Sequence, residues 1–171
     1  ARQSTREEIE QLLCDRLVES SSYQLACTAE VDRASEELTV RAAAVTTEYL
    51  DDIRIPADDS ETTLGPGGRA AQTGETPVIR GLQSSSEVEP WKDVAEKHGL
   101  ESLVVVPIEY DGTLYGIFAV YADREDAFTG EELAVIEDLG EIVGHTVQSL
   151  ERKRLLMTDE VVRIDLRLQR A

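Results

Sequence analysis

The chain opens with apolar residues at helical spacing. They recur three or four positions apart, at Ile9, Leu12, Leu13 and Leu17. Ser4 and Glu7 form a capping-box pattern, in which a hydroxyl and a carboxylate satisfy each other's free N–H groups. The spacing predicts an amphipathic helix over residues 4–20. Apolar and β-branched content then predicts strands over residues 23–31 and 37–45.

Short elements follow in the middle of the chain. Either Pro66 or the glycines beside it open a predicted helix that Gly74 closes. Residues 77–79 are predicted to form a short strand, and residues 89–98 a helix that ends before a glycine.

The next segment predicts a β-hairpin. Apolar runs over residues 103–110 and 113–121 flank Asp111 and Gly112, and an Asp-Gly pair suits a type I′ turn because both central positions need positive φ. Pro107 lies inside the first run. Because proline has no N–H, it predicts an edge position, a bulge or a lost ladder bond there.

A long helix and an alternating tail end the chain. Thr129 and Glu132 form a second capping box, and apolar residues then recur at Ile136, Leu139, Val143 and Leu150. A helix running to about residue 156 would be roughly 40 Å long, so part of it should project. Beyond it, apolar and polar residues alternate over residues 162–168, which predicts a strand that pairs with a sheet edge or with its own copy.

Charge narrows the classes of partner. The 171 residues include 35 acidic and 17 basic ones, for a formal net charge of −18. Nucleic acids and anionic membranes are held by Lys and Arg, so this segment should contact neither. Acidic residues, few lysines and small apolar side chains indicate a cytoplasmic protein adapted to high salt, because salt screens the self-repulsion. No apolar run is long enough for a transmembrane helix.

Residues with catalytic potential form no recognisable set. Cys14 and Cys27 lack the spacing of a zinc site or a disulfide framework and are predicted to be small buried side chains. His98 and His145 have no nucleophile or carboxylate placed beside them by local spacing. The glycines at 65 and 67 follow an acidic loop, not the strand that a dinucleotide motif needs. We therefore expect no catalytic residues, no metal site and no cofactor.

Four phrases in the second half carry a family resemblance. They are residues 68–79 (GRAAQTGETPVI), 99–108 (GLESLVVVPI), 111–121 (DGTLYGIFAVY) and 127–133 (AFTGEEL). In this order and spacing they resemble the GAF domain, a small-molecule-binding and dimerising module of signalling proteins, over about residues 4–156. The resemblance implies an α+β fold with an antiparallel sheet of five or six strands. It places the terminal helices on one face and the pocket-side helices and loops on the other.

The acidic composition and the tail make the chain similar to the GAF domains of haloarchaeal bacterio-opsin-activator-type regulators. In these, the resemblance implies, sensor domains precede a helix-turn-helix. It divides the chain into a sensor domain, residues 1–157, and residues 158–171, the first strand of a following domain or a linker. The cyclic-nucleotide signature of other members is not found, and neither are cysteines at the positions used by bilin-binding and sulfoxide-reducing members.

The resemblance leads to two functional hypotheses. In the first, an unidentified small molecule binds at a pocket whose candidate residues are Arg69, Arg80, Trp91 and His98. In the second, the domain is a purely structural dimerisation module without a ligand. Both allow a homodimer through the last helix, with candidate contacts Val143, Leu150 and Met157. An enzyme is the third class and ranks last.

Overall fold

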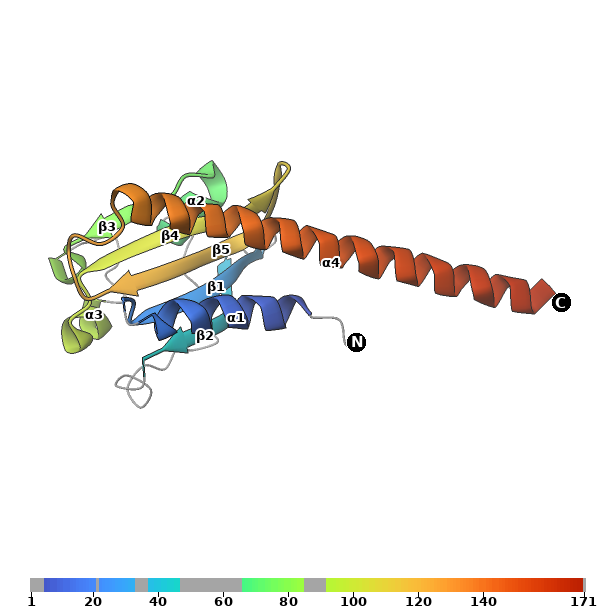
Figure 1. Ribbon diagram of the computed structural model, residues 1–171, viewed down its shortest axis with the longest axis horizontal. Helices are drawn as coiled ribbons and strands as arrows, with labels where there is room; N and C mark the ends of the chain where they lie inside the picture. Colours follow the sequence, from blue (N-terminus) through green and yellow to red (C-terminus); the bar gives the residue numbers. More distant parts are fainter. Residues whose placement is uncertain (1–4, 21, 33–36, 47–65, 85–91, 171) are drawn as a thin grey trace.

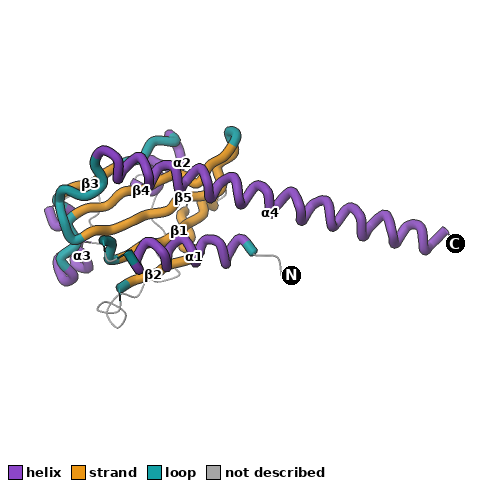
Figure 2. Tube along the Cα trace, viewed as in Figure 1, coloured by secondary structure: helices purple, strands orange, loops and turns teal. Residues whose placement is uncertain are grey.

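The computed structural model describes residues 5–20, 22–32, 37–46, 66–84 and 92–170. In chain order its elements are α1 (Arg6–Glu19), β1 (Leu25–Asp32), β2 (Glu37–Val45), α2 (Pro66–Thr73), β3 (Val78–Arg80), the 3₁₀ turn η1 (Leu82–Ser84), α3 (Lys92–His98), β4 (Ser102–Tyr110), β5 (Thr113–Ala122) and α4 (Gly130–Arg170). The strands form one antiparallel sheet in the order β2-β1-β5-β4-β3 (Figures 1 and 2). The predicted α+β class and strand number are confirmed.

Helices cover both faces of this sheet, and β4 shows how. Its residues Val104, Val106 and Ile108 belong to the core shared with α1 and α4. Leu103 and Val105 belong to the second core, which also contains side chains of α2, η1 and α3. Because side chains alternate along a strand, a strand buried on both faces appears in the sequence as a continuous apolar run. The terminal helices share one face, as predicted.

The β4–β5 hairpin forms as predicted. Asp111 has φ 53° and Gly112 has φ 79°, the positive values that a type I′ turn needs. Pro107 lies on β4 beyond the end of β3, which pairs only with Ser102–Val104. The Val105 N–H donates toward the β3 side, and the nitrogen two residues later points the same way. Pro107 therefore occupies an open edge and loses no ladder bond.

Helix α4 lies directly on the backbone of β4. A Cβ atom added at Gly140 would lie 2.5 Å from the carbonyl oxygen of Pro107, and one added at Gly144 would lie 2.5 Å from that of Glu109. Both distances are below any normal contact. The two glycines therefore allow the helix to approach the sheet closely.

The caps of the two terminal helices differ in detail from the predicted ones. Thr5, not Ser4, caps α1 and accepts a hydrogen bond from the Glu8 N–H at 3.2 Å; Ser4 lies outside the described residues. At the start of α4, the Glu132 carboxylate accepts from the Phe128 N–H at 2.6 Å. The two capping patterns marked the helix starts correctly to within one residue.

The strand predicted over residues 162–168 is wrong. Helix α4 continues without a break to Arg170, and its second half, residues 151–170, projects from the sheet (Figure 1). No Gly or Pro occurs between residues 145 and 170 to stop the helix, and extending a formed helix costs far less than starting one. The projection expected of a long last helix is confirmed, and residues 158–170 do not form the strand expected of a following domain.

Candidate functional site

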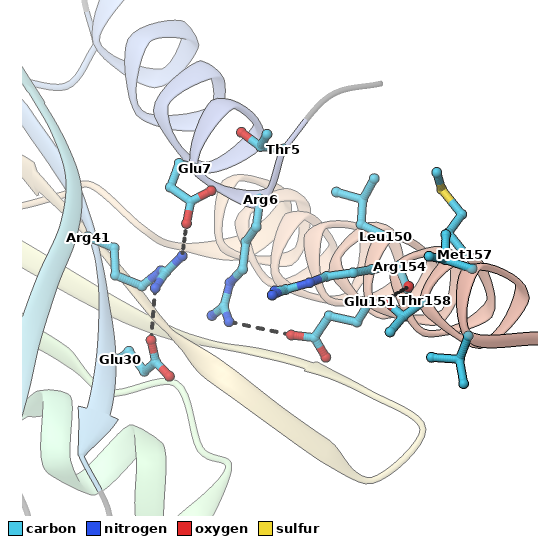
Figure 3. A pocket seen from close by; sticks show the side chains of 12 residues that line it. Thr5, Arg6, Glu7, Glu30, Arg41, Leu150, Glu151, Arg154, Met157 and Thr158 are labelled. Carbon is cyan, nitrogen blue, oxygen red and sulfur yellow. Dashed lines mark hydrogen bonds and ion pairs between the residues drawn. The ribbon is translucent and has the colours of Figure 1, made fainter. Parts of the chain in front are cut away.

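A groove of about 820 Å³ opens where α4 leaves the sheet (Figure 3). One wall is the N-terminal end of α1, and another is formed by Glu30 of β1 and Arg41 of β2. The third is the start of the projecting half of α4, which contributes Leu150, Arg154 and Met157. The groove therefore combines charged side chains from the domain with both apolar and charged side chains from α4.

A buried carboxylate lies beside this groove. The Glu10 side chain is only 1% exposed and accepts from Arg6 Nε at 3.0 Å, Arg41 Nε at 2.8 Å and the Thr28 hydroxyl at 3.5 Å. A buried charge is tolerated when it is paired and hydrogen-bonded, and removing one partner is costly. The network fixes α1 on β1 and β2.

The two arginines of this network also reach further. Arg6 donates to the Tyr115 carbonyl at 2.5 Å and lies 3.7 Å from the Glu151 carboxylate of α4. Arg41 also forms ion pairs with the carboxylates of Glu7 at 3.1 Å and Glu30 at 2.9 Å. Their guanidinium groups are thus held by contacts within the domain, and Arg6 connects α1, β5 and the point where α4 departs.

Three of the four predicted pocket residues lie in the described part of the chain. Arg69 is exposed on α2, and His98 is the partly exposed last residue of α3. Arg80 faces the α4 side, because its neighbour Ile79 packs on the other face; its guanidinium donates to carbonyl oxygens between β5 and α4, including that of Ala127 at 2.6 Å. Trp91 lies outside the described residues. The structure therefore places Arg80 toward the face of the sheet opposite α2 and α3, the helices that carry Arg69 and His98.

The predicted dimer residues are divided by the edge of the sheet. Val143 is 6% exposed and belongs to the core under α4, so its own domain covers it and it is unavailable to a second chain. Leu150 is partly buried in the groove wall, and Met157 is 55% exposed on the projecting half. Only the last two remain candidates for a contact between chains.

The cysteines and histidines occupy structural positions. Cys14 is fully buried, as predicted, and burial raises the pKa of its thiol well above the usual value. Cys27 is partly exposed. His145 stacks on Tyr110 with ring centroids 4.5 Å apart. Among the described residues, no group of three His, Cys, Asp or Glu could hold a metal ion.

Sequence reasoning missed the Glu10 network and the groove. One signal was present: Glu10 lies three and four positions before Leu13 and Cys14, on the face of α1 that is buried. A carboxylate on an apolar face demands a partner. Its partner Arg41 lies 31 residues away, so local spacing could not identify it.

Two curated proteins are similar to almost the whole chain. A "Putative transcriptional regulator" of Haloferax volcanii is 31% identical over 166 residues, which cover 97% of this chain and 27% of that protein. The bacterioopsin transcriptional activator of Halobacterium salinarum is 26% identical over 167 residues, covering 98% and 23%. The chain thus spans about a quarter of the length of these relatives.

Solved structures share the fold. A red/green cyanobacteriochrome in its green light-absorbing state superposes with a TM-score of 0.71 at 19% identity, covering 88% of this chain and 99% of that one. A free methionine-R-sulfoxide reductase of Thermoplasma acidophilum gives 0.63 at 18% identity, covering 85% and 96%. No described helix is both long and apolar enough to cross a membrane. The sequence profile of the GAF domain matches residues 3–148, and the chain belongs to the GAF domain family.

Proposed function

We propose that this chain is a non-catalytic sensory domain of a cytoplasmic transcription regulator, and that it relays its signal through α4 as a homodimer. Both curated relatives are named as transcription regulators. The net charge of −18 opposes direct contact between this domain and nucleic acid. Any DNA contact would belong to another part of a longer chain.

One observation carries the proposal: the projecting half of α4 exposes a regular apolar stripe. Met157, Val161, Ile164 and Leu168 are between 55% and 71% exposed. They continue from Leu150 at alternating four- and three-residue spacing, which is the spacing of a coiled-coil seam. We call the six residues at this spacing the seam: Leu150, Arg154, Met157, Val161, Ile164 and Leu168.

A helix of this kind needs a partner. An isolated helix of this length is only marginally stable in water, and most helical stability in proteins comes from packing of an apolar face. The first half of α4 has the sheet beneath it, whereas residues 151–170 are exposed throughout wherever their side chains are described. A second copy would cover the seam with an identical stripe.

Sedimentation equilibrium in about 1 M KCl, where charge repulsion is screened within ~3 Å, tests this pairing. We expect a dimer for the native chain and a monomer for Val161→Asp, because a buried carboxylate at that seam position has no cation one helical turn away on the seam to pair with. Leu156→Asp is the matched control. Its side chain is 61% exposed but lies outside the seam, so it should stay dimeric. A native chain that is monomeric at all concentrations would overturn the proposal.

The signal we propose is a small molecule bound on the sheet face below α2 and α3. Partly buried apolar side chains, including Val31, Val45 and Ala71, line the edge of the core on that face and would contact it. Native mass spectrometry of the purified protein should detect a retained compound, and that compound at a hundred times its dissociation constant should stabilise the fold by about 2.7 kcal/mol. If no compound stabilises the fold and the dimer persists, the domain is the structural dimerisation module of the alternative hypothesis.

A further inference from the structure

One seam residue is charged. Arg154 occupies the position four residues after Leu150 and three before Met157, and the other five seam residues are apolar. Its side chain lines the groove and extends toward α1 (Figure 3). A single charged residue in a coiled-coil core lowers stability but fixes register and the number of chains.

The guanidinium of Arg154 differs from the other two in the groove. Arg6 and Arg41 are each paired with carboxylates of their own domain. For Arg154 no ion pair and no side-chain hydrogen bond is found among the described residues, although Glu151 lies one turn away and pairs with Arg6. Within the described part of the chain, Arg154 is therefore a cation at the seam without a paired carboxylate.

The charges beside the seam favour parallel pairing. In a parallel pair, Lys153 and Glu160 each meet the residue five positions later in the second chain. Lys153 therefore meets Thr158, and Glu160 meets Asp165. The second of these is the one contact between like charges. In an antiparallel pair overlapping over residues 150–168, like charges meet at every charged flanking position: Lys153 with Arg167, Glu151 with Asp165, and Glu160 with its copy.

We propose that Arg154 and the second copy's Arg154 form a binding position for a small inorganic anion on the axis of a parallel, in-register α4 pair, so that pairing tightens when an anion is bound. The inference rests on the proposed dimer. In register, each seam residue faces its own copy, so two guanidinium groups approach each other with Lys153 adjacent. Without an anion they repel, and with one between them they bind it from both sides.

Sedimentation equilibrium of the native chain, Arg154→Leu and Arg152→Leu in a chloride series tests this. Arg152 is exposed and lies about 160° around the helix from Arg154, so its variant changes the net charge equally without touching the seam. From about 0.2 M to 2 M chloride we expect the dissociation constant of the native chain and of Arg152→Leu to fall about tenfold more than that of Arg154→Leu. At equal ionic strength, replacing chloride by sulfate should lower the dissociation constant of the native dimer more than that of the Arg154→Leu dimer.

The outcomes separate the two proposals. Equal salt dependence in all three dimers overturns the anion position and leaves the dimer standing. Three monomers at every salt concentration overturn the dimer and the anion position together. The parallel register has its own readout: Leu168→Cys, in a chain carrying Cys27→Ala, should form an intermolecular disulfide, and Leu166→Cys, outside the seam, should form little. A dimer without that disulfide overturns the parallel arrangement.

Discussion

The two halves of α4 carry the same apolar spacing in opposite environments. In residues 130–150 the stripe is buried, with Ile136 2%, Val143 6% and Val147 0% exposed. In residues 151–170 the stripe continues, but its described side chains are exposed, and Leu168 is 71% exposed. Both glycines of α4 after its first residue fall in the first half. The seven-residue pattern thus specifies the helix, and the glycines specify where the sheet lies beneath it.

The largest effect should come from adding a side chain where α4 packs against β4. Gly144→Ala adds a methyl group 2.5 Å from the Glu109 carbonyl oxygen. Alanine is the better helix former by about 1 kcal/mol, so propensity alone predicts stabilisation. The clash with backbone atoms exceeds this gain and predicts a net loss of about 3 kcal/mol. Thermal unfolding should show a melting temperature lower by roughly 6–12 °C. Glu141→Ala on the exposed face is the control, and an unchanged or raised melting temperature for Gly144→Ala would contradict the close approach.

The same substitution at two equivalent positions sharpens the comparison. Val147 and Val161 lie two heptads apart on one stripe, the first fully buried and the second 65% exposed. Val147→Ala should lower the free energy of unfolding by about 2 kcal/mol, because it removes buried methyl groups and leaves a cavity. Val161→Ala should cost under about 0.5 kcal/mol in a dilute monomer. Urea unfolding measures both, and equal losses would mean that the second half is covered within one chain.

Acid should destabilise the start of α4. Glu132 accepts hydrogen bonds from Tyr23 and Arg124, both at 2.7 Å, and from the Phe128 N–H. Burial acts to raise the pKa of Glu132, but these hydrogen bonds outweigh it and hold the pKa below the ordinary 4.5. Because the folded pKa is lowered, this stability is present above pH 4.5 and is lost as pH falls through the folded pKa.

Urea unfolding from about pH 6 to pH 3 therefore measures the contribution of this cluster. Glu132→Gln should be less stable than the native chain at neutral pH and should lose less stability on acidification. Glu131→Gln, which alters an exposed neighbour, should follow the native chain. Parallel pH profiles of the free energy of unfolding for the native chain and Glu132→Gln would show that Glu132 does not contribute to the loss of stability in acid.

The smallest effect should arise at the boundary between the halves. Glu151 is 50% exposed and lies 3.7 Å from Arg6. Exposed pairs of this kind contribute well under 1 kcal/mol, so Glu151→Ala should change the free energy of unfolding by less than about 0.5 kcal/mol. A loss above 2 kcal/mol in chemical denaturation would show that α1 holds the base of the projecting half.

Local signals predicted most of the fold. The Asp111-Gly112 pair located the hairpin, and the continuous apolar runs beside it are buried on both faces. The tail was mispredicted because Ile164 and Leu168 satisfy both the alternation of a strand and the spacing of a helix. A strand needs a partner strand, whereas a helix needs only the turn before it. The groove could not be predicted, because Arg6 and Tyr115 meet across 109 residues.

The straight projecting half of α4 has a mechanical consequence. Residues 151–170 extend about 30 Å beyond the sheet, so a tilt of about 10° at the base would displace the far end by roughly 5 Å. The same rod fixes direction: deleting one residue would turn whatever follows by about 100°, and deleting seven would nearly restore it. In the proposed dimer, the angle and the rotational phase at the far end of α4 would therefore depend on the length of this rod as much as on its side chains.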